Sequence, residues 1–381
     1  MKILFFTHEK ELGGASKALI TLINDLKKNN EIFVVTPFND SKIIFELKDS
    51  NVKFISCFFS WWQVPTNISV IKKCLFKIAY LFNTISIIRL KKIIRNLDID
   101  IIHSNTSVID IGAIIARKLH IPHVWHFREF TGKHLSYIKG EKKSYQFIND
   151  SKSSIIYISK AIQHFYEKNI NKKFGHLIYD GVPNNYSLSK KYNKKNEIIF
   201  LQVATLEKNK GQDVAIRAVN ILKKEGYKNF KLLLAGGNPT NYWNELKNNI
   251  KKYNIDDIVE YIGFVNDMNN LRAKVDVELM CAPKEAFGLV TIEGMMAGNP
   301  VIGSNSGATS ELIINGENGY LYELNNEKDL ANKMKFFLDN YYQIEKMGAK
   351  ASKYAIKNFS SKNNTLSTIK LYQEILKRVK I

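Results

Sequence analysis

Residues 275–311 read VDVELMCAPKEAFGLVTIEGMMAGNPVIGSNSGATSE, and the pattern of this stretch sets the fold class. The apolar run at 275–281 predicts a buried strand, and PVIGS at 300–304 predicts another. Between them, Gly288 precedes an apolar segment long enough for a helix that starts near Leu289, and Gly307 follows the second strand in a further loop. Strand, loop, helix and strand in this order indicate an α/β unit with a parallel sheet.

The same rhythm extends over most of the chain and predicts two α/β domains in succession. Short apolar runs predict one series of strands at 2–7, 31–36, 52–56, 100–104, 123–127 and 154–159, and a second at 197–204, 230–236, 259–263, 275–281 and 300–304. We expect an N-terminal domain over 1–183, a linker over 184–196, a C-terminal domain over 197–355, and a terminal helix over 356–381 that packs back on the N-terminal domain. Ligands of such folds bind at the carboxyl ends of the strands, so two facing sheets predict a central cleft.

Length, composition and charge are consistent with this organisation. A chain of 381 residues suits about two domains, and 45% hydrophobic with 24% charged residues is ordinary globular composition. The formal net charge of +20 favours an anionic partner. Three scattered cysteines predict neither a disulfide framework nor a zinc site, which favours a reducing compartment. The first residues lack a secretory pattern, and lysines interrupt the apolar segment near residues 70–95, so we expect no membrane-spanning helix and a cytoplasmic location.

Two glutamates in the deciding stretch are candidate ligands for a bound molecule. Glu285 is expected in a loop, and Glu293 lies about two turns farther on, within the helix. The peptide N–H groups of residues 287–289 would lie at the N-terminus of that helix, where a phosphate or a sugar hydroxyl can be held. The alternative is that both glutamates are solvated helix residues.

The segment KEAFGLVTIEGMMAGNPVIGSNSGATSELI, residues 284–313, resembles the donor-binding block of the retaining glycosyltransferases of family 4. That block runs E-x-F-G-x-x-x-x-E-A-M-A-x-G-x-P-V-I, followed by a Gly-containing turn and a Glu. Further similarity is found in the loop Gly13-Gly14-Ala15-Ser16, in YDGVP at 179–183 and in VATLEKNKGQD at 203–213. The resemblance implies the GT-B fold, in which two Rossmann-like domains with parallel sheets face a central cleft.

The resemblance also implies roles for the residues around the donor. Glu285 would bind the transferred sugar near its C3 hydroxyl, and Glu293 would hold the ribose of the nucleotide. The amides around three consecutive residues would cradle the sugar: Phe287, Gly288 and Leu289.

Further donor-side roles fall on other loops. Lys210 would neutralise the departing diphosphate, although Thr205 stands five residues before it where many relatives have Arg. The backbone at Gly14 would approach the phosphate and the acceptor. His126, at the end of the strand HVWHF, would orient the donor sugar, although a lone histidine on a buried strand is more often a core residue.

By the same resemblance, the chain would be a metal-independent, retaining hexosyltransferase that needs no cofactor. Its donor would be a sugar linked to a nucleoside diphosphate, with UDP as the first candidate. The leaving phosphate would itself take the proton of the attacking hydroxyl, which is consistent with the lack of an obvious catalytic triad in the sequence. The acceptor is inferred from the basic, aromatic N-terminal lobe, which suggests a lipid-linked glycan of the kind used for capsule, O-antigen or lipooligosaccharide.

The window 57–97 is the candidate acceptor and membrane side. Residues 51–100 hold eight basic and two acidic residues, and apolar residues from Ile71 onward recur at helical spacing. Such a helix can lie on an anionic bilayer, which would place the protein on the inner face of the cell membrane. The alternative is an ordinary amphipathic helix that covers the N-terminal sheet. The residues assigned to this side are Trp61, Trp62, Lys72, Lys73, Lys77 and Arg128, of which Arg128 could instead pair with Glu129 or Glu9.

Other function classes fit the sequence less well. A nucleic-acid-binding protein would explain the charge but not the glycine- and glutamate-rich loops. A dinucleotide-dependent dehydrogenase would need G-x-G-x-x-G where this chain has GGAS. A sugar-nucleotide isomerase or a noncatalytic relative of the same fold stays open as an alternative.

Overall fold

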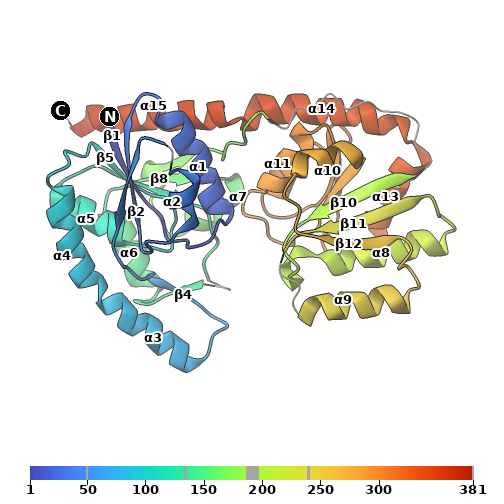
Figure 1. Cartoon of the computed structure of the whole chain (residues 1–381), viewed down its shortest axis with the longest axis horizontal. Coiled ribbons are helices and arrows are strands. Elements are labelled where there is room, and N and C mark those ends of the chain that lie inside the picture. The colour runs from blue at the N-terminus through green and yellow to red at the C-terminus, as the bar shows by residue number, and fades with distance from the viewer. Residues whose placement is uncertain (49, 133–134, 186–196, 238–240, 380–381) are drawn as a thin grey trace. The chain divides into compact units, whose positions relative to one another are not determined.

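The computed structural model describes residues 1–48, 50–132, 135–185, 197–237 and 241–379 (Figure 1). It divides into two compact units. Unit 1 consists of Met1–Gly181 together with Ser361–Ile381, and unit 2 consists of Val182–Ser360. Each unit is built around its own parallel sheet, as the strand pattern predicts.

Unit 1 contains a seven-stranded sheet in the order β3-β2-β1-β5-β6-β8-β9, in which every pair is parallel. The strands are β1 (Lys2–Phe6), β2 (Glu31–Thr36), β3 (Val52–Ser56), β5 (Ile101–Ser104), β6 (His123–Phe127), β8 (Ser154–Tyr157) and β9 (Gly175–Leu177). Two short strands, β4 (Gln63–Pro65) and β7 (Leu135–Tyr137), form a separate antiparallel pair. The strand order reverses between β1 and β5, so the loops after these strands diverge at one edge.

Helices cover both faces of this sheet because most of its strands are apolar on both sides. The helices are α1 (Gly14–Leu26), α2 (Lys42–Glu46), α3 (Val70–Leu81), α4 (Asn83–Ile94), α5 (Ile111–Leu119), α6 (Glu141–Asp150), α7 (Lys160–Tyr166) and α15 (Ser361–Val379), with a 3-10 turn η1 at Lys172–Phe174. On one face, α1 and α15 share a core with β1 and β2. On the other, α4 and α5 close a second core.

Unit 2 contains a six-stranded parallel sheet in the order β12-β11-β10-β13-β14-β15. The strands are β10 (Ile198–Val203), β11 (Phe230–Ala235), β12 (Val259–Gly263), β13 (Val277–Met280), β14 (Val301–Ser304) and β15 (Gly319–Tyr322). The helices are α8 (Gln212–Lys224), α9 (Asn241–Lys252), α10 (Met268–Lys274), α11 (Leu289–Met296), α12 (Thr309–Leu312), α13 (Glu327–Asp339) and α14 (Tyr342–Phe359), with a 3-10 turn η2 at Lys208–Lys210. The strands β10 and β13 are parallel neighbours in the sheet, so the loops that follow them begin side by side at its carboxyl edge, and the strand order reverses between them.

The predicted fold class, two Rossmann-like parallel-sheet domains, is confirmed. All eleven predicted strands are present, and each of their ends lies within two residues of the predicted position, whereas β4, β7, β9 and β15 are short and were not predicted. The terminal helical region differs from the expected single helix over 356–381, because α14 ends at Phe359 and α15 begins at Ser361 as part of unit 1. Most of the predicted linker, residues 186–196, lies outside the described residues.

Candidate active site

The loop after β10 is held against β13 by a glycine. Gly211 caps α8 with a φ of 69°, and a Cβ there would overlap the carbonyl oxygen of Cys281. Two glutamine side chains fix the loop from within, since Gln202 Nε2 donates to the Lys210 carbonyl at 2.7 Å and Gln212 Nε2 donates to the Thr205 carbonyl at 2.8 Å. Only glycine gives both this left-handed backbone and this close approach, so the position of Lys210 is set by packing at the edge of the sheet.

The loop after β13 carries Glu285 and leads into α11. The Glu285 carbonyl accepts a hydrogen bond from the Ala308 amide at 3.0 Å, and a Cβ at Gly307 would lie 2.5 Å from that same carbonyl oxygen. Gly288 caps α11 with a φ of 100° and no side-chain hydrogen bond to the helix. The first N–H groups of α11 have no acceptor within the helix, so this N-terminus carries partial positive charge.

Lys210 and Glu285, the two residues assigned to opposite ends of the donor's reacting bond, lie together. Lys210 Nζ is 3.6 Å from Glu285 Oε2, and the side chains keep 31% and 20% of their surface exposed. The loops after β10 and β13 therefore place a cation, a carboxylate and the N-terminus of α11 at one edge of unit 2. Such a set can hold a diphosphate and a sugar hydroxyl.

The neighbouring assigned residues are buried or half-buried. Phe287 is 3% exposed and its ring packs on Phe359 with centroids 6.0 Å apart, so the Phe287 side chain belongs to the core. Leu289 is half-buried at the first position of α11.

Glu293 pairs with an arginine that the sequence analysis did not single out. Glu293 Oε2 accepts from Arg272 Nη1 at 2.9 Å, and Arg272 Nε donates to Glu278 Oε1 at 3.0 Å. Arg272 and Glu278 are buried, whereas the Glu293 side chain keeps 22% of its surface exposed. The sequence did contain a signal for such a pair: Glu278 lies inside the apolar run VDVELMC, and a buried carboxylate requires a partner.

In unit 1, the glycine loop after β1 is occupied by a carboxylate from the chain itself. Glu9 Oε2 accepts a hydrogen bond from the Ser16 amide at 2.9 Å and another from the Ser16 hydroxyl. A Cβ on Gly13 would overlap this carboxylate, whereas one on Gly14 would meet no atom within 4 Å. The backbone at Gly14 is therefore sterically open, while Glu9 satisfies the first turn of α1.

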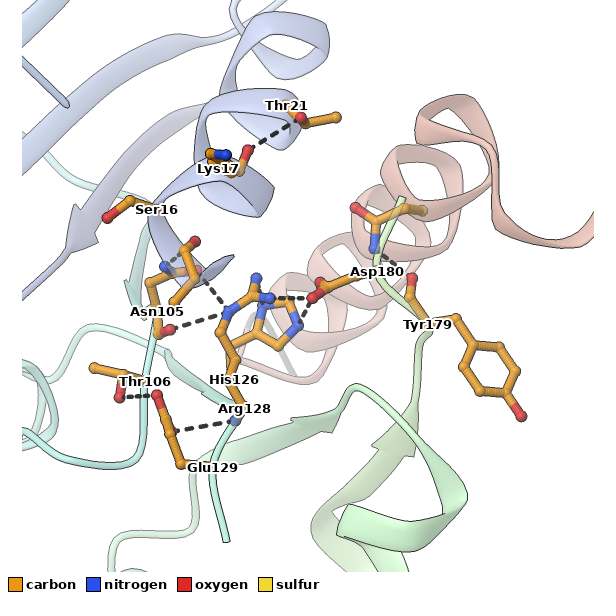
Figure 2. Close-up of polar contacts among 12 residues, drawn as sticks. Ser16, Lys17, Thr21, Asn105, Thr106, His126, Arg128, Glu129, Tyr179 and Asp180 are labelled. Carbon is orange, nitrogen blue, oxygen red and sulfur yellow. Dashed lines mark hydrogen bonds and ion pairs between the residues drawn. The ribbon is translucent and has the colours of Figure 1, made fainter. Parts of the chain in front are cut away.

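Arg128 is the centre of a buried polar network at the carboxyl ends of β5 and β6 (Figure 2). Its Nη1 pairs with Asp180 Oδ2, and its Nε lies 3.1 Å from both the main-chain oxygen and Oδ1 of Asn105. The guanidinium thus pairs with neither Glu9 nor Glu129, and its side chain is only 4% exposed. Burial raises the pKa of Asp180, and the adjacent arginine opposes that rise. The placement of Arg128 on a membrane side is wrong, because its guanidinium is buried and paired inside unit 1, whereas its contact with an acceptor stays a prediction.

His126 is fully buried beside Arg128. Arg128 Nη2 and His103 Nε2 both lie 3.2 Å from His126 Nδ1, and the Tyr372 hydroxyl lies 2.6 Å from His103 Nδ1. A guanidinium only donates, so His126 Nδ1 is an acceptor and Nε2 carries the proton. That Nε2 lies 3.7 Å from Asp180 Oδ1. Burial, with a further contribution from Arg128, holds the pKa values of both histidines well below the usual range, so both rings are neutral. The ring of His126 is thus enclosed in unit 1 rather than exposed for the expected contact with a sugar.

The aromatic residues before α3 do not form one exposed patch. Trp62 is 2% exposed, stacks on Trp125 with ring centroids 5.9 Å apart, and donates from Nε1 to the Ser107 carbonyl at 2.8 Å. The assignment of Trp62 to a membrane side is therefore wrong, because the ring fills the core. Trp61 is half-buried between His8 and Phe76.

Helix α3 has an exposed apolar face that nothing in unit 1 covers. All residues of α3 are described, and none of them is buried. The exposed apolar side chains of α3 and of the first half of α4 are Val70, Ile71, Leu75, Ile78, Leu81, Phe82, Ile85 and Ile88, which we call the α3–α4 apolar face. The opposite side of the helix pair α3–α4 packs on the rest of unit 1, and there Asn83, Ser86 and Leu90 of α4 are buried. The alternative that this stripe covers the N-terminal sheet is therefore wrong.

Lysines accompany this face. Lys72 and Lys77 are exposed and Lys73 is half-buried. The chain has no Asp or Glu between residues 66 and 97. No helix in the described part of the chain is long and apolar enough to cross a membrane.

Comparisons with known proteins agree with this arrangement. A family model described as glycosyl transferases group 1 matches residues 186–358, and a model of glycosyltransferase family 4 matches residues 12–185. An uncharacterised glycosyltransferase of Methanocaldococcus jannaschii is 29% identical over 305 residues, which cover 78% of this chain and 81% of that protein.

Two further comparisons span nearly the whole chain. The N-acetylgalactosamine-N,N'-diacetylbacillosaminyl-diphospho-undecaprenol 4-alpha-N-acetylgalactosaminyltransferase of Campylobacter jejuni is 25% identical over 360 residues, covering 89% of this chain and 90% of that protein. The crystal structure of Anabaena HepE in complex with UDP superposes with a TM-score of 0.81 at 20% identity, covering 98% of this chain and all of that one. The two family models lie end to end over the two units, and the chain belongs to the group 1 glycosyltransferases, with the GT-B fold.

Proposed function

We propose that this glycosyltransferase moves a hexose-type sugar from a nucleoside diphosphate, UDP in the first place, to a lipid-linked glycan, with retention of the anomeric configuration. Lipid-linked acceptors of this kind are used for capsule, O-antigen and lipooligosaccharide. The reaction would need no bound metal and no cofactor.

The observation that carries this proposal is the pairing of Lys210 with Glu285 beside the uncapped N-terminus of α11. In the proposed donor complex, the carboxylate of Glu285 accepts hydrogen bonds from hydroxyls of the sugar. The Lys210 ammonium lies on the diphosphate, and the amides of Gly288 and Leu289 supply further positive charge. A second glycine-capped N-terminus, that of α8 after Gly211, begins at the same edge of the sheet.

Catalysis by this arrangement would be electrostatic. As the bond between the anomeric carbon and the diphosphate breaks, negative charge develops on the leaving oxygen, and Lys210 with the two helix N-termini stabilises it. The acceptor hydroxyl then attacks the oxocarbenium-like carbon from the face that the diphosphate leaves, and its proton passes to the leaving phosphate. Configuration is retained because both events occur on one face of the sugar.

Two comparisons support the choice of donor and acceptor. HepE of Anabaena was crystallised with UDP, which supports uridine as the nucleoside of the donor. The Campylobacter relative acts on a glycan linked to diphospho-undecaprenol, which supports a lipid-linked acceptor.

The α3–α4 apolar face supports a membrane location for the transfer. Six basic residues and no acidic residue lie in α3 and α4, and an exposed apolar face flanked by cations suits an anionic bilayer. We propose that the protein docks through this face on the inner leaflet of the cell membrane, where an acceptor on a lipid is within reach.

The decisive experiment is a transfer assay. Purified protein is incubated with a panel of UDP-, GDP- and ADP-sugars and an undecaprenyl-diphosphate-linked glycan, in buffer with and without EDTA. We expect one UDP-sugar to give an extended glycolipid, with an anomeric proton of the same configuration as the donor and a rate unaffected by EDTA. Release of free sugar or a rearranged nucleotide sugar, with no extended lipid, would instead favour a hydrolase or an isomerase.

A further inference from the structure

Unit 2 contains a buried ionic cluster that ends on the candidate ribose ligand. Arg272, on α10, is 0% exposed and lies between Glu278 on β13 and Glu293 on α11. Asn299 Nδ2 donates to the same Glu278 oxygen, Oε1, at 3.1 Å. Burial lowers the pKa of the Arg272 guanidinium, but Glu278 and Glu293 outweigh it and leave that pKa above its usual value.

The cluster fits only because a glycine follows Glu293. A Cβ on Gly294 would lie 2.5 to 2.7 Å from three atoms of the Glu278 carboxyl group. That carboxyl group has little freedom to move aside, because Arg272 and Asn299 both bind it. Alanine favours a helix more than glycine does, so glycine in the middle of α11 is explained by the space that Glu278 occupies.

We propose that Arg272 and Glu278 form a mount that fixes the carboxylate of Glu293 in the orientation in which it binds the ribose of the donor nucleotide. Arg272 is then a positioning residue: its guanidinium binds Glu293, and Glu278 in turn holds the guanidinium. This inference rests on the proposed function, because it requires a nucleotide at unit 2.

The geometry gives the two oxygens of Glu293 different tasks. Oε2 accepts from Arg272, whereas Oε1 makes no hydrogen bond to any other residue in the described ranges, and 22% of the side chain is exposed. A carboxylate held at one oxygen can accept from ribose hydroxyls with the other without losing rotamer freedom on binding. Two carboxylates share one guanidinium in the mount, so the three groups together keep a negative charge with which Glu293 can accept hydrogen bonds.

The test measures how much more tightly the protein binds UDP than an analogue that lacks the ribose hydroxyls. Dissociation constants are measured by calorimetry for UDP and for 2′,3′-dideoxy-UDP, in the wild type and in the variants Glu278→Gln and Gly294→Ala. We expect the wild type to prefer UDP about tenfold, the effect of one charge-assisted hydrogen bond. In both variants this ratio should fall toward one, while the affinity for the dideoxy form changes little, because Lys210 and the helix N-termini are untouched.

Two further variants separate positioning from folding. Gly294→Ala should lower Tm because of the overlap. The triple variant Arg272→Met with Glu278→Val and Gly294→Ala should recover much of that loss, because the shorter side chain at 278 makes room for the methyl group and no buried charge is left without a partner. This triple variant should still lack the preference for UDP, because the mount is gone. The matched control is Glu225→Gln, which removes an exposed carboxylate 2.8 Å from Lys335 on the same unit and should keep the wild-type ratio.

Three results would overturn the inference. If Glu278→Gln and Gly294→Ala both keep the wild-type ratio, the mount does not position Glu293. A wild type that binds UDP and its dideoxy form equally would remove the ribose contact while leaving nucleotide binding, and with it the proposed function, intact. A wild type that binds none of UDP, GDP and ADP would overturn this inference and the proposed function together.

Discussion

Lys210 Nζ and Glu285 Oε2 lie 3.6 Å apart although the two residues belong to different loops, one after β10 and one after β13. Gly211 sets the position of the first loop against Cys281, and Gly307 sets that of the second against the Glu285 carbonyl. Backbone contacts rather than side-chain packing therefore bring this ion pair together, which leaves both charged groups accessible to a ligand.

Replacing either member of this pair should stop sugar transfer without unfolding the protein. We expect Lys210→Ala and Glu285→Gln each to lower kcat/KM by about 10² or more, the usual effect of losing a group that stabilises developing charge. Both side chains are partly exposed, so the free energy of unfolding should change by only about 0.5 kcal/mol. The measurement is steady-state transfer together with thermal unfolding.

Lys223→Ala provides the matched control for this experiment. Lys223 also lies in unit 2, pairs with Asp257 at 3.0 Å and has a similar exposure of 35%. It should transfer sugar at the wild-type rate. Wild-type kinetics in both Lys210→Ala and Glu285→Gln would contradict the assignment of the site.

The sheets and the loops of unit 2 could be predicted from sequence because their signals are local. A strand buried on both faces is a continuous apolar run, and a residue shortly after such a run must lie at the carboxyl edge of the sheet. Glu285 could be assigned to that edge for this reason, whereas Lys210 was assigned through the resemblance to family 4. The edge strand β15 could not be predicted, since GYLY is half-buried and does not form such a run.

Pairings over long sequence separations could not be predicted. His103 meets Tyr372 across 269 residues, and Arg128 meets Asp180 across 52. Nothing near Arg128 in the chain distinguishes a buried partner from a ligand. The prediction that Trp62 lies on a membrane side was wrong for a related reason. A run of adjacent aromatic residues has the same composition whether it faces lipid or fills a core.

Gly211→Ala should impair both stability and transfer. Alanine at a φ of 69° costs about 1 kcal/mol, and its Cβ would also overlap the Cys281 carbonyl, so the loop that carries Lys210 must move. We expect a loss of about 3 kcal/mol or more in the free energy of unfolding of unit 2, and a lower kcat/KM.

The variant Gly226→Ala separates the cost of alanine at a positive φ from the cost of the overlap with Cys281. Gly226 also has a positive φ, 92°, but a Cβ there meets no atom within 4 Å. It should show only the backbone cost and keep normal transfer. Equal losses of stability in the two variants would mean that the approach of Gly211 to Cys281 is not tight.

The stability of unit 1 should depend on pH through His123. This ring is buried in β6, its two nitrogens each lie 2.9 Å from a serine hydroxyl, Ser104 or Ser153, and burial lowers its pKa to about 3. In the unfolded chain, the His123 ring takes up a proton as the pH falls below its ordinary pKa of about 6.5, whereas in the folded chain burial keeps the ring neutral. The contribution of His123 is therefore fully present above about pH 6.5 and is lost at about 1.4 kcal/mol per unit as the pH falls.

The variant His123→Asn isolates this contribution. Between pH 7.5 and pH 5, the difference in the free energy of unfolding between wild type and variant should shrink by about 2 kcal/mol. Urea titrations followed by tryptophan fluorescence can measure it, since Trp61, Trp62 and Trp125 all lie in unit 1. A difference that stays constant over this range would show that the folded state admits the proton.

The α3–α4 apolar face should bind anionic vesicles, and its apolar and basic parts should contribute separately. Leu75 and Ile78 are 58% and 52% exposed, so Leu75→Ser with Ile78→Ser should leave folding intact. This variant should lower vesicle affinity about 100-fold, from about 1.5 kcal/mol for each side chain buried in lipid.

The variant Lys72→Gln with Lys77→Gln tests the basic part. It should lower the affinity for vesicles containing phosphatidylglycerol about 30-fold, at about 1 kcal/mol for each lysine, and should have little effect on the affinity for pure phosphatidylcholine. Co-sedimentation measures both effects. Phe264→Ser, which removes a 72% exposed side chain from unit 2, is the control and should bind as the wild type does. If the Leu75 and Ile78 variant binds as the wild type does, this face is not the membrane contact.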